Sequence, residues 1–416
     1  MNLLEAITEK AKAFQATSVK IVANYGADGI SGAALLSLTF QRLRIPFATS
    51  FVMHVDTEIL EQLAKEPYET FVFVDTGAAA SGTLGLVLAQ KKVLIIDHHP
   101  GEQHADMLNP LQFGLEADSI NSAGIAYLFC RQLWPDIRSH AHLAIVGALG
   151  DRQKMESEFH HLLLAESVSA GTLARKKGIK LLGYQTRALK HIVPECCGEH
   201  ASEVLRDSEL DPSLRLSALD EVQMLKLHGA LEKHVGSQEL QEQYLLGEME
   251  AREFALLLEA CGRSKDVGAG MGACFGDAEL RKRASDSFLQ FRKEMLEAKA
   301  WLAAHPEAVH LDRGLVIVNA GLAVRPQIVG ALAEDLLQAY ETSLVMSRME
   351  GKTKVSLRSK KLDCLDTLQP LLQQTGGNWH GHAGAAGGCF PIAMEEAFLQ
   401  LSKDTLTRIQ MEETLQ

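Results

Sequence analysis

The sequence predicts an α/β protein with an N-terminal parallel sheet, a helical connector and a smaller C-terminal α/β domain that carries a glycine-rich loop. Up to residue 151, β-branched and aromatic runs alternate with helix-like segments, which is typical of parallel sheets with right-handed crossovers. Residues 152–260 show no strand-like runs of comparable strength, and the alternation resumes after residue 314. A chain of 416 residues exceeds one ordinary core. The expected domains are 1–155, a helical region 156–303, a second α/β domain 304–395 and a helical tail 396–416.

The N-terminal elements follow one another in a regular order. An amphipathic helix is expected over residues 1–16, and Ser31 is expected to cap a helix over residues 32–42. A last apolar segment, residues 142–150, precedes Asp151. The strands predicted from apolar runs are 19–23, 47–55, 71–75 and 93–96.

The composition limits the class of protein. Hydrophobic residues make up 46% and charged residues 23%, as in a folded globular protein, and no apolar run reaches the length of a membrane span. Acids near the N-terminus stand where a signal peptide carries bases, and seven scattered cysteines argue against a disulfide framework. We therefore expect a cytoplasmic protein without a membrane partner. The net charge of −12 disfavours a general nucleic-acid coat, but it allows a nuclease with a local basic groove or a surface for a basic partner protein.

Four polar turns follow four separate apolar segments of the N-terminal region. They carry Asp28, Asp75, Asp97 with His98 and His99, and Asp151. In a parallel sheet such turns converge on one edge, where ligands bind. A single Asp at a strand end is most often a helix cap or a turn former, but four such turns with a His pair favour a metal site. Carboxylates with imidazole suit Mn²⁺ or Mg²⁺ better than zinc, and such a site supports phosphoester hydrolysis.

Other histidines and cysteines carry weaker signals. The His160-His161 pair is interpreted as a surface pair on a helix, with a further metal ligand as the lesser alternative. The adjacent Cys196 and Cys197 lack the spacing of zinc ligands, so a structural zinc site is disfavoured. Residues 278–303 predict a charged helix that connects domains.

A glycine-rich segment, residues 376–388, closes the second α/β domain. Glycines at this density let backbone N–H groups approach an anion, and they leave His380 and His382 able to donate to phosphate. A flexible linker is the alternative, although a linker is not expected to carry Trp and two His residues. A nearby basic patch favours contact with a phosphate backbone, with a solvated strand face as the alternative. The patch consists of Lys352, Lys354, Arg358, Lys360 and Lys361, with Ser356 among them.

These motifs resemble the DHH phosphoesterase superfamily, in its RecJ-like branch. The matching segments stand in the family's order along the chain. They are Ala27-Asp28-Gly29-Ile30, Phe73-Val74-Asp75, Asp97-His98-His99, Gly147-Ala148-Leu149-Gly150-Asp151 and the glycine-rich segment 376–388. Residues 121–127 and 253–263 also resemble the archaeal RecJ-like group, whose members are nucleases associated with the replication factor GINS. Residues 160–245 are covered only loosely.

The resemblance implies a role for each of these residues. Asp28, Asp75, His98 and Asp151 would bind one divalent ion, Mn²⁺ or Mg²⁺. Asp97 and His99 would orient ligands from behind and complete the catalytic group with His98. The residues that would hold the backbone of single-stranded DNA or RNA are Ser356, Arg358, His380, Gly381, His382 and Gly384.

The first motif departs from the family pattern, which reads His-x-Asp-Ala-Asp-Gly. Asn24 and Gly26 stand at the positions of the His and the first Asp, which in the family hold a second metal together with a bridging carboxylate, here Asp75. The resemblance thus implies one preserved metal position and one degenerate position. Three functions stay open: an attenuated exonuclease on single-stranded nucleic acid, an inactive scaffold of the replication helicase complex that binds GINS, and a phosphodiesterase of oligonucleotides or dinucleotides.

Overall fold

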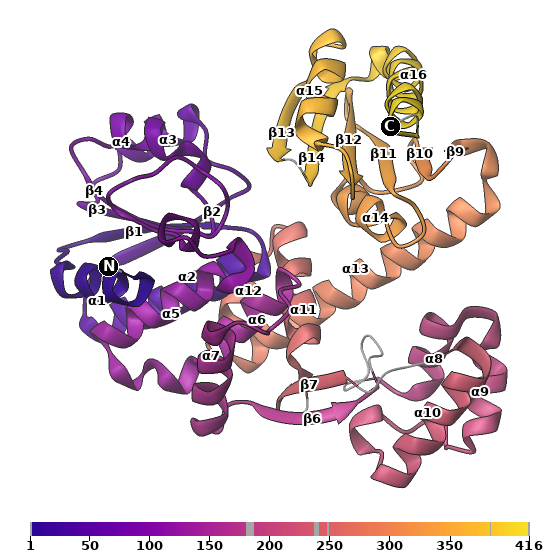
Figure 1. Ribbon diagram of the computed structural model, residues 1–416, viewed down its shortest axis with the longest axis horizontal. Helices are drawn as coiled ribbons and strands as arrows, with labels where there is room; N and C mark the ends of the chain where they lie inside the picture. The colour runs from indigo at the N-terminus through magenta and orange to yellow at the C-terminus, as the bar shows by residue number, and fades with distance from the viewer. Residues whose placement is uncertain (1, 180–186, 237–240, 248, 383, 415–416) are drawn as a thin grey trace. The chain divides into compact units, whose positions relative to one another are not determined.

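The computed structural model describes residues 2–179, 187–236, 241–247, 249–382 and 384–414, without the side chains of residues 380, 382 and 410–414 (Figure 1). The chain divides into two compact units, Met1–Ser285 and Asp286–Gln416. Among the described residues, no helix combines the length and the apolar character needed to cross a membrane.

The first unit is built around a five-stranded parallel sheet with the strand order β2-β1-β3-β4-β5. Its strands are β1 (Val19–Asn24), β2 (Phe47–Val52), β3 (Thr70–Val74), β4 (Lys92–Ile96) and β5 (Met107–Leu108). The four predicted strands are confirmed. The fifth strand was not predicted, because two residues are too short to carry a periodic pattern.

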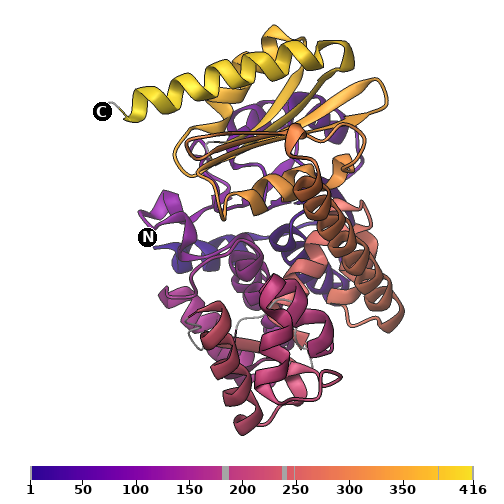
Figure 2. The ribbon, with the colours of Figure 1, turned by 90° about the vertical axis from the view of Figure 1, so that its right-hand side faces the viewer.

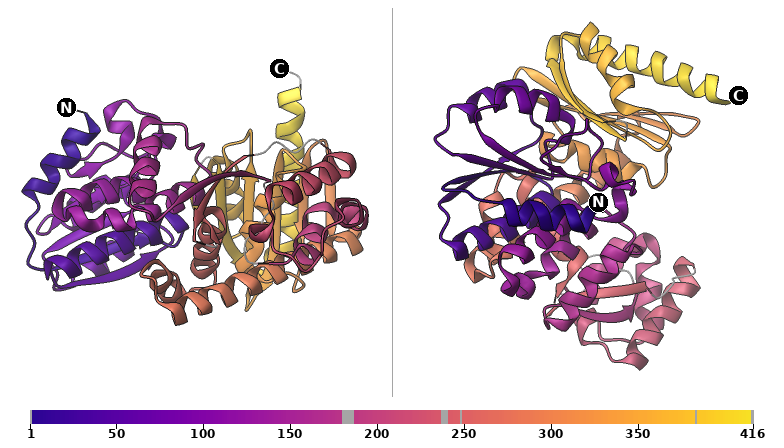
Figure 3. Two further views of the ribbon diagram at one scale, coloured as in Figure 1. Left: turned by 90° about the horizontal axis from the view of Figure 1, so that it is seen from below. Right: turned by 60° about the vertical axis from the view of Figure 1, so that its left-hand side comes forward.

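Helices cover both faces of this sheet (Figures 1 and 3). On one face, α3 (Thr57–Ala64) and α4 (Ser81–Val87) pack on the apolar side chains of the strands, including Phe71 and Phe73 of β3. The helices of the other face are α1 (Leu3–Ala13), α2 (Ala27–Leu43) and α5 (Ser122–Leu133), with α6 (His142–Gly150) packed against α2 and α5. The sheet is therefore buried on both sides, as the uninterrupted apolar runs indicate.

Two expectations about these helices are wrong. α2 begins at Ala27 instead of residue 32, with Gly26 at the N-cap, so Asp28 and Ser31 lie inside the helix. An Asp is favourable in the first turn of a helix, where the macrodipole is positive, so Asp28 does not prevent the helix from starting at Ala27. The apolar segment 142–150, grouped above with the strand ends, is helix α6. It is buried on almost every side, so no polar face reveals its helical period.

The region between the first sheet and the connecting helix adds further helices. α7 (Glu158–Ser169), α11 (Ala251–Arg263) and α12 (Val267–Cys274) extend the helical layer, and α11 packs against α6, α2 and α12. A separate cluster with an apolar core of its own consists of α8 (Leu189–Cys197), α9 (Ala201–Ser208) and α10 (Glu221–Val235).

The same region also contains a small antiparallel sheet, which corrects the expectation of a connector without strands. Its strands are β6 (Ala174–Gly178), β7 (Gln241–Leu246) and β8 (Met249–Glu250), in the order β6-β7-β8. β6 and β7 carry several charged and amide side chains, so they lack the apolar runs by which strands are recognised.

The second unit contains a six-stranded mixed sheet with the order β13-β14-β12-β11-β10-β9. Its first four strands are β9 (Val309–Asp312), β10 (Leu315–Asn319), β11 (Thr342–Met349) and β12 (Lys352–Ser359). Figure 2 shows helices on both faces of this sheet, with α16 on one side and α14 on the other. The helices of this unit are α14 (Val329–Leu336), α15 (Cys364–Gln374) and α16 (Glu395–Thr414), and the predicted connecting helix is α13 (Ala278–Ala304).

The glycine-rich segment is a β-hairpin and not a loop. β13 (Asn378–His382) pairs antiparallel with β14 (Ala385–Pro391), and Ala383 lies outside the described residues. Gly381 belongs to β13, and Gly384 lies in the turn. A Cβ atom on Gly388 would lie 2.0 Å from the backbone oxygen of Asn378, so the two strands approach closely only because this position is glycine.

Candidate metal centre

The carboxyl edge of the parallel sheet brings the predicted strand-end residues to one level. Val74 at the end of β3 pairs with Ala23 of β1 and with Ile96 of β4, so the residues that follow leave the three strands side by side. The chain reverses its direction of sheet building between β1 and β3, and open α/β sheets bind ligands at such a point. The strand order alone therefore selects this edge as the candidate site.

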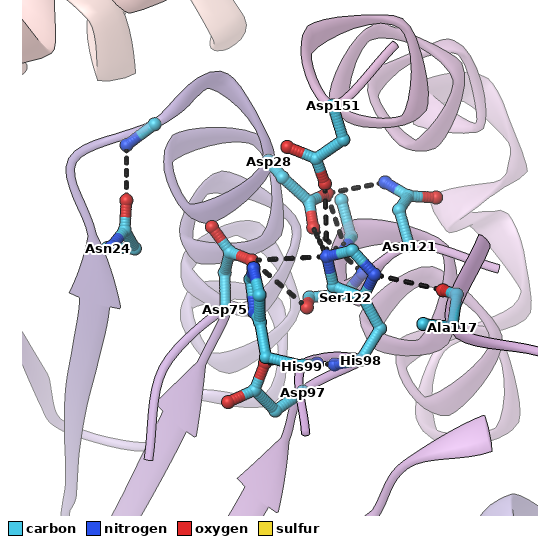
Figure 4. A network of polar contacts seen from close by, with 12 residues as sticks. Asn24, Asp28, Asp75, Asp97, His98, His99, Ala117, Asn121, Ser122 and Asp151 are labelled. Atoms are coloured by element: carbon cyan, nitrogen blue, oxygen red, sulfur yellow. Dashed lines mark hydrogen bonds and ion pairs between the residues drawn. The ribbon is translucent and has the colours of Figure 1, made fainter. Parts of the chain in front are cut away.

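Four predicted side chains converge at this edge, as Figure 4 shows. The ligand atoms of Asp28, Asp75, His98 and Asp151 all lie within 4.8 Å of one another. The first three residues are buried, and Asp151, with 27% of its side chain exposed, forms the open side. A second overlapping group joins Asp75 and His98 to His99. Three carboxylates with one imidazole form a donor set that suits Mn²⁺ or Mg²⁺.

The first turn of α5 holds the Asp28 carboxylate in place. Its Oδ2 atom accepts a hydrogen bond from the backbone N–H of Ser122 (2.8 Å), and Oδ1 accepts one from Ala123 (2.9 Å) and one from the Asn121 amide. The positive end of a helix favours a carboxylate at this place. Gly147 of α6 leaves room for it, because a Cβ atom there would lie 2.3 Å from Asp28 Oδ1. The position of Asp28 is thus fixed by the fold itself.

His98 presents one ring nitrogen to the carboxylates. Its Nδ1 lies 3.0 Å from the carbonyl oxygen of Ala117 and donates to it, which leaves Nε2 as the ligand atom. Nε2 lies 3.1 Å from Asp151 Oδ2 and 3.8 Å from Asp75 Oδ1. It is buried and makes no hydrogen bond of acceptable geometry within the described part of the chain. Buried polar atoms normally have a partner, so this nitrogen fits a metal ligand.

The protonation of the cluster reflects its crowded negative charge. Burial, together with the charges of Asp28 and Asp151, raises the pKa of Asp75 well above its ordinary value. Burial and the charge of Asp28 raise the pKa of Asp151 to about 6. Burial lowers the pKa of His98, but the Asp151 carboxylate, 3.1 Å from Nε2, and the charge of Asp28 outweigh it and raise that pKa to about 9. Carboxylates packed in this way are stabilised by protons or by a cation.

Asp97 holds the His pair in place. Its Oδ1 atom accepts hydrogen bonds from the backbone N–H groups of His98 (2.9 Å) and His99 (3.2 Å) and from His99 Nδ1 (2.8 Å), and Oδ2 accepts one from Ala78 (2.9 Å). Burial alone would raise the pKa of Asp97, but the hydrogen bonds from His99 and Ala78 keep it below its ordinary value. His99, with 47% of its side chain exposed, keeps Nε2 for contact with other groups.

The two degenerate positions border the cluster. Asn24 Oδ1 accepts a hydrogen bond from the Gly26 backbone (2.8 Å), and Asn24 Nδ2 donates to the carbonyl oxygen of Met53 (3.2 Å). Figure 4 shows Asn24 apart from the converging side chains. A Cβ atom on Gly26 would lie 3.2 Å from Asn24 Oδ1 and 3.9 Å from Asp75 Oδ2, so position 26 faces the same site without contributing a side chain.

Four of the six predicted substrate-binding residues lie in two rows of the C-terminal sheet, with the row that contains Gly381 between them. The strand register places Ser356 in one row with His380, and Arg358 in one row with His382, each through one residue of β14. The side chains of His380 and His382 lie outside the described residues. Arg358 makes contacts within the protein: Nη1 lies 2.7 Å from Ser356 Oγ, and Nε lies 3.3 Å from Glu334 Oε2. The structure thus brings the four positions into two alternate rows of one sheet.

A buried contact between His160 and Gln153, next to His98, was not predicted from the sequence. His160 is only 1% exposed, so the interpretation as a surface pair is wrong. Its Nε2 lies 2.8 Å from Gln153 Oε1, and the Gln153 amide nitrogen lies 3.5 Å from His98 Nδ1. The sequence does carry a signal, because His160 shares the helical i, i+3, i+4 spacing of Leu163 and Leu164 on the buried face of α7.

The fold and the site define a two-domain α/β protein with a divalent-cation donor set at the switch point of its parallel sheet. The model of the DHH family, N-terminal domain, matches residues 18–165, and the model of the DHHA1 domain matches residues 313–408. The chain belongs to the DHH superfamily, with a RecJ-like fold and a C-terminal DHHA1 domain.

Individual relatives are distant in sequence. An uncharacterized protein from Methanocaldococcus jannaschii is 23% identical over 452 aligned residues, which cover 96% of this chain and 97% of the relative. The crystal structure of exonuclease RecJ bound to manganese superposes with a TM-score of 0.64 at 18% identity, covering 97% of this chain and 93% of RecJ. The structure of CDC45 from Entamoeba histolytica gives a TM-score of 0.70 at 12% identity, covering 97% and 98%. At these identities the likeness concerns the fold.

Proposed function

We propose that this chain is a divalent-cation-dependent phosphodiesterase that hydrolyses single-stranded DNA or RNA as an exonuclease. The observation that carries the proposal is the buried Nε2 atom of His98, which lies among three carboxylates without a hydrogen bond in the described part of the chain. Membership of the DHH superfamily and the likeness of fold to an exonuclease that was crystallised with manganese support it.

We assign Asp28, Asp75, His98 and Asp151 to hold one Mn²⁺ or Mg²⁺ ion. Such an ion activates a water molecule and neutralises charge on phosphoryl oxygens. The chain's own contribution is to fix the donors: α5 orients Asp28, and the carbonyl of Ala117 orients His98. Partners of this kind set the direction of a ligand before it binds.

His99 is the side chain that we assign to the substrate. Asp97 holds its Nδ1 atom at 2.8 Å, so Nε2 is the atom that reaches outward. From this position His99 can hydrogen-bond a phosphoryl oxygen or give a proton to the leaving oxygen. Asp97 acts through His99, because its own oxygens are occupied by four hydrogen bonds.

In the second unit we assign Ser356, Arg358 and the β13–β14 hairpin to contact with the nucleic-acid backbone. The hairpin brings His380 and His382 into the same rows as these residues. Two exposed lysines, Lys352 at the start of β12 and Lys360 directly after its end, add positive charge in an acidic chain. Contacts of this kind position a backbone and do not read its sequence.

The test is cleavage of 5′-labelled single-stranded DNA and RNA by the purified chain with Mn²⁺, next to Asp151→Ala. We expect the wild type to shorten the labelled strand in a metal-dependent reaction that EDTA abolishes. Cleavage no faster than that of Asp151→Ala would disprove the enzymatic function.

A second candidate is a RecJ-like scaffold subunit that binds a GINS-type replication protein. The observation that favours it is the altered first motif, in which Gly26 has no side chain and Asn24 uses its oxygen to hold the turn. Its test is co-elution of the full chain with a GINS-type protein at low salt. Separate elution of the two proteins would exclude this candidate.

A further inference from the structure

Helix α11 brings a carboxylate close to Gly26, the position of the first motif that has no side chain. Glu259 lies on α11, 232 residues after Ala27, and its Oε1 atom accepts a hydrogen bond from the Ala27 backbone N–H at 2.7 Å. A Cβ atom on Gly26 would lie 3.3 Å from this same oxygen. The Glu259 carboxylate therefore borders the space that a side chain at position 26 would enter.

Close packing fixes the approach of α11 to this loop. Gly262 lies one turn after Glu259, and a Cβ atom there would lie 2.0 Å from the backbone oxygen of Tyr25. Only glycine allows the helix to rest so closely on the loop that carries Gly26. Arg263, on the next turn, lies 3.4 Å from Glu259 Oε2 and orients that side of the carboxylate. Oε1 is left to face the first-motif loop.

Three oxygen atoms from three separate elements thus surround position 26. The distances from a Cβ atom on Gly26 are 3.2 Å to Asn24 Oδ1, 3.3 Å to Glu259 Oε1 and 3.9 Å to Asp75 Oδ2. Asp75 is shared between two regions, since its Oδ1 atom lies 3.8 Å from His98 Nε2 and from His99 Nδ1. Two carboxylates that approach one point in a largely buried place repel each other unless a cation lies between them.

We propose that Glu259 supplies, from helix α11, the carboxylate that Gly26 lacks, and that it joins Asp75 and Asn24 in holding a second divalent cation. The inference rests on the proposed function, because it completes the same centre. In this proposal, the carboxylate ligand comes from helix α11, whereas in the family pattern it comes from the first motif. The centre then keeps two cation positions, although Gly26 contributes no side-chain ligand to either of them.

The alternative role of Glu259 is that of a cap for the start of α2. Gly26 provides no side-chain cap, and the Ala27 N–H is bonded to Glu259. The variant Glu259→Gln separates the two roles, because an amide oxygen still accepts the hydrogen bond from Ala27 but no longer supplies a charge. A cap role predicts unchanged metal binding in this variant, and a ligand role predicts the loss of one ion.

The experiment counts Mn²⁺ ions bound per full-length chain, by equilibrium dialysis and by the electron paramagnetic resonance signal of coupled Mn²⁺ pairs. We expect two ions in the wild type and one in Glu259→Gln, with the affinity for the second ion lowered at least about tenfold. The matched control is Glu253→Gln, which removes another buried carboxylate from α11 and should leave two ions bound. Thermal unfolding of each variant shows that it is folded.

A swap of the two positions gives an independent test. In the variant Gly26→Asp with Glu259→Ala, the carboxylate returns from the first motif, so we expect two ions and a restored coupled signal. Gly26→Asp alone places a second carboxylate within contact distance of Glu259 and should not increase the number of ions. Failure of the swap to exceed Glu259→Ala in bound Mn²⁺ would count against the inference.

One bound ion in the wild type, or two ions in Glu259→Gln with wild-type affinity, would overturn the proposal. These results are independent of nucleic-acid cleavage, which is measured separately. Two ions that depend on Glu259, without any cleavage, would leave this inference intact and exclude the enzymatic function. Cleavage above the Asp151→Ala background by a wild-type chain that binds a single ion would do the reverse.

Discussion

The two sides of the cluster at the end of the parallel sheet are built in different ways. The side of His98 comprises Asp28, His98 and Asp151, which follow the ends of strands and of a helix within the DHH motifs. Buried hydrogen bonds from α5 hold Asp28 in place on this side. On the side of Gly26, the strand end offers only an amide, and the neighbouring carboxylate belongs to Glu259 on a distant helix. A motif that is lost from the sequence is therefore not the same as a donor that is lost from the site.

Asp75→Asn should have the largest effect, because its carboxylate faces both sides of the cluster. We expect the loss of both Mn²⁺ ions and a fall in Mn²⁺-dependent cleavage of more than about 100-fold, beyond the range typical of changes to a residue behind a ligand. Dialysis and initial cleavage rates measure the two quantities. The control is Asp56→Asn, since an Asn at this exposed N-cap of α3 still caps the helix. Retention of one tightly bound ion would show that the two sides do not share Asp75.

Asn121→Ala is expected to affect only the side of His98. The Asn121 amide donates to Asp28 and to the carbonyl oxygen of Ala144, and neither bond reaches the Gly26 side. We expect the affinity for the first ion to fall by about 10- to 100-fold, as for other residues that orient a ligand. Calorimetric titration with Mn²⁺ measures the two affinities separately. A larger loss at the second ion than at the first would contradict the division into two sides.

Stabilisation by Mn²⁺ should increase with pH. Asp151 has a pKa of about 6 in the folded chain, above its ordinary value, so the folded state binds the extra proton and its stability falls as pH rises through about 6. The pKa of His98, raised to about 9, acts in the same direction: its stabilisation is complete below about 6.5 and is lost as pH rises through about 9. A bound cation replaces these protons.

The measurement is the midpoint of thermal unfolding in Mn²⁺ and in EDTA, at pH 5.5 and at pH 8. We expect the difference between Mn²⁺ and EDTA to be larger at pH 8, because fewer protons compete with the cation there. Asp151→Asn should reduce this pH dependence, since it removes one of the titrating groups of the cluster. An equal or larger Mn²⁺ effect at pH 5.5 would contradict the assignment of these residues as ligands.

The convergence of the side chains around His98 could be predicted from sequence, because each of them is recognised from the local pattern of its own segment. Asp28, Asp75 and His98 each follow a strand of one parallel sheet, and strand ends in such a sheet meet at one edge. Glu259 could not be predicted in this way, because nothing in its local pattern distinguishes it from a solvated Glu on an amphipathic helix. Its place depends on the close packing of Gly262 against Tyr25, which is a property of the folded chain.

The errors in the predicted fold have related causes. Helix α6 is apolar on nearly all sides, so its period could not be distinguished from that of a buried strand. The β13–β14 hairpin consists largely of residues without bulky side chains, and backbone pairing alone defines its strands. In both cases the tertiary surroundings decide the structure, whereas the parallel strands, with their continuous β-branched runs, could be predicted from sequence.

Lys352→Ala should have the smallest effect and should leave both sides of the cluster unchanged. Lys352 is an exposed residue at the start of β12, next to the hairpin in the strand register, so its loss removes one backbone contact and no metal ligand. We expect weaker binding of single-stranded DNA, with a slope of log affinity against log salt that is shallower by about 0.7, and unchanged Mn²⁺ binding. Fluorescence anisotropy over a salt series measures the slope. The control is Lys403→Ala, which removes a lysine from α16, a helix outside the six-stranded sheet, and should leave the slope as it is. If the slope is the same in all three proteins, Lys352 does not contact the backbone, and binding then depends on the cluster or on other residues of the second unit.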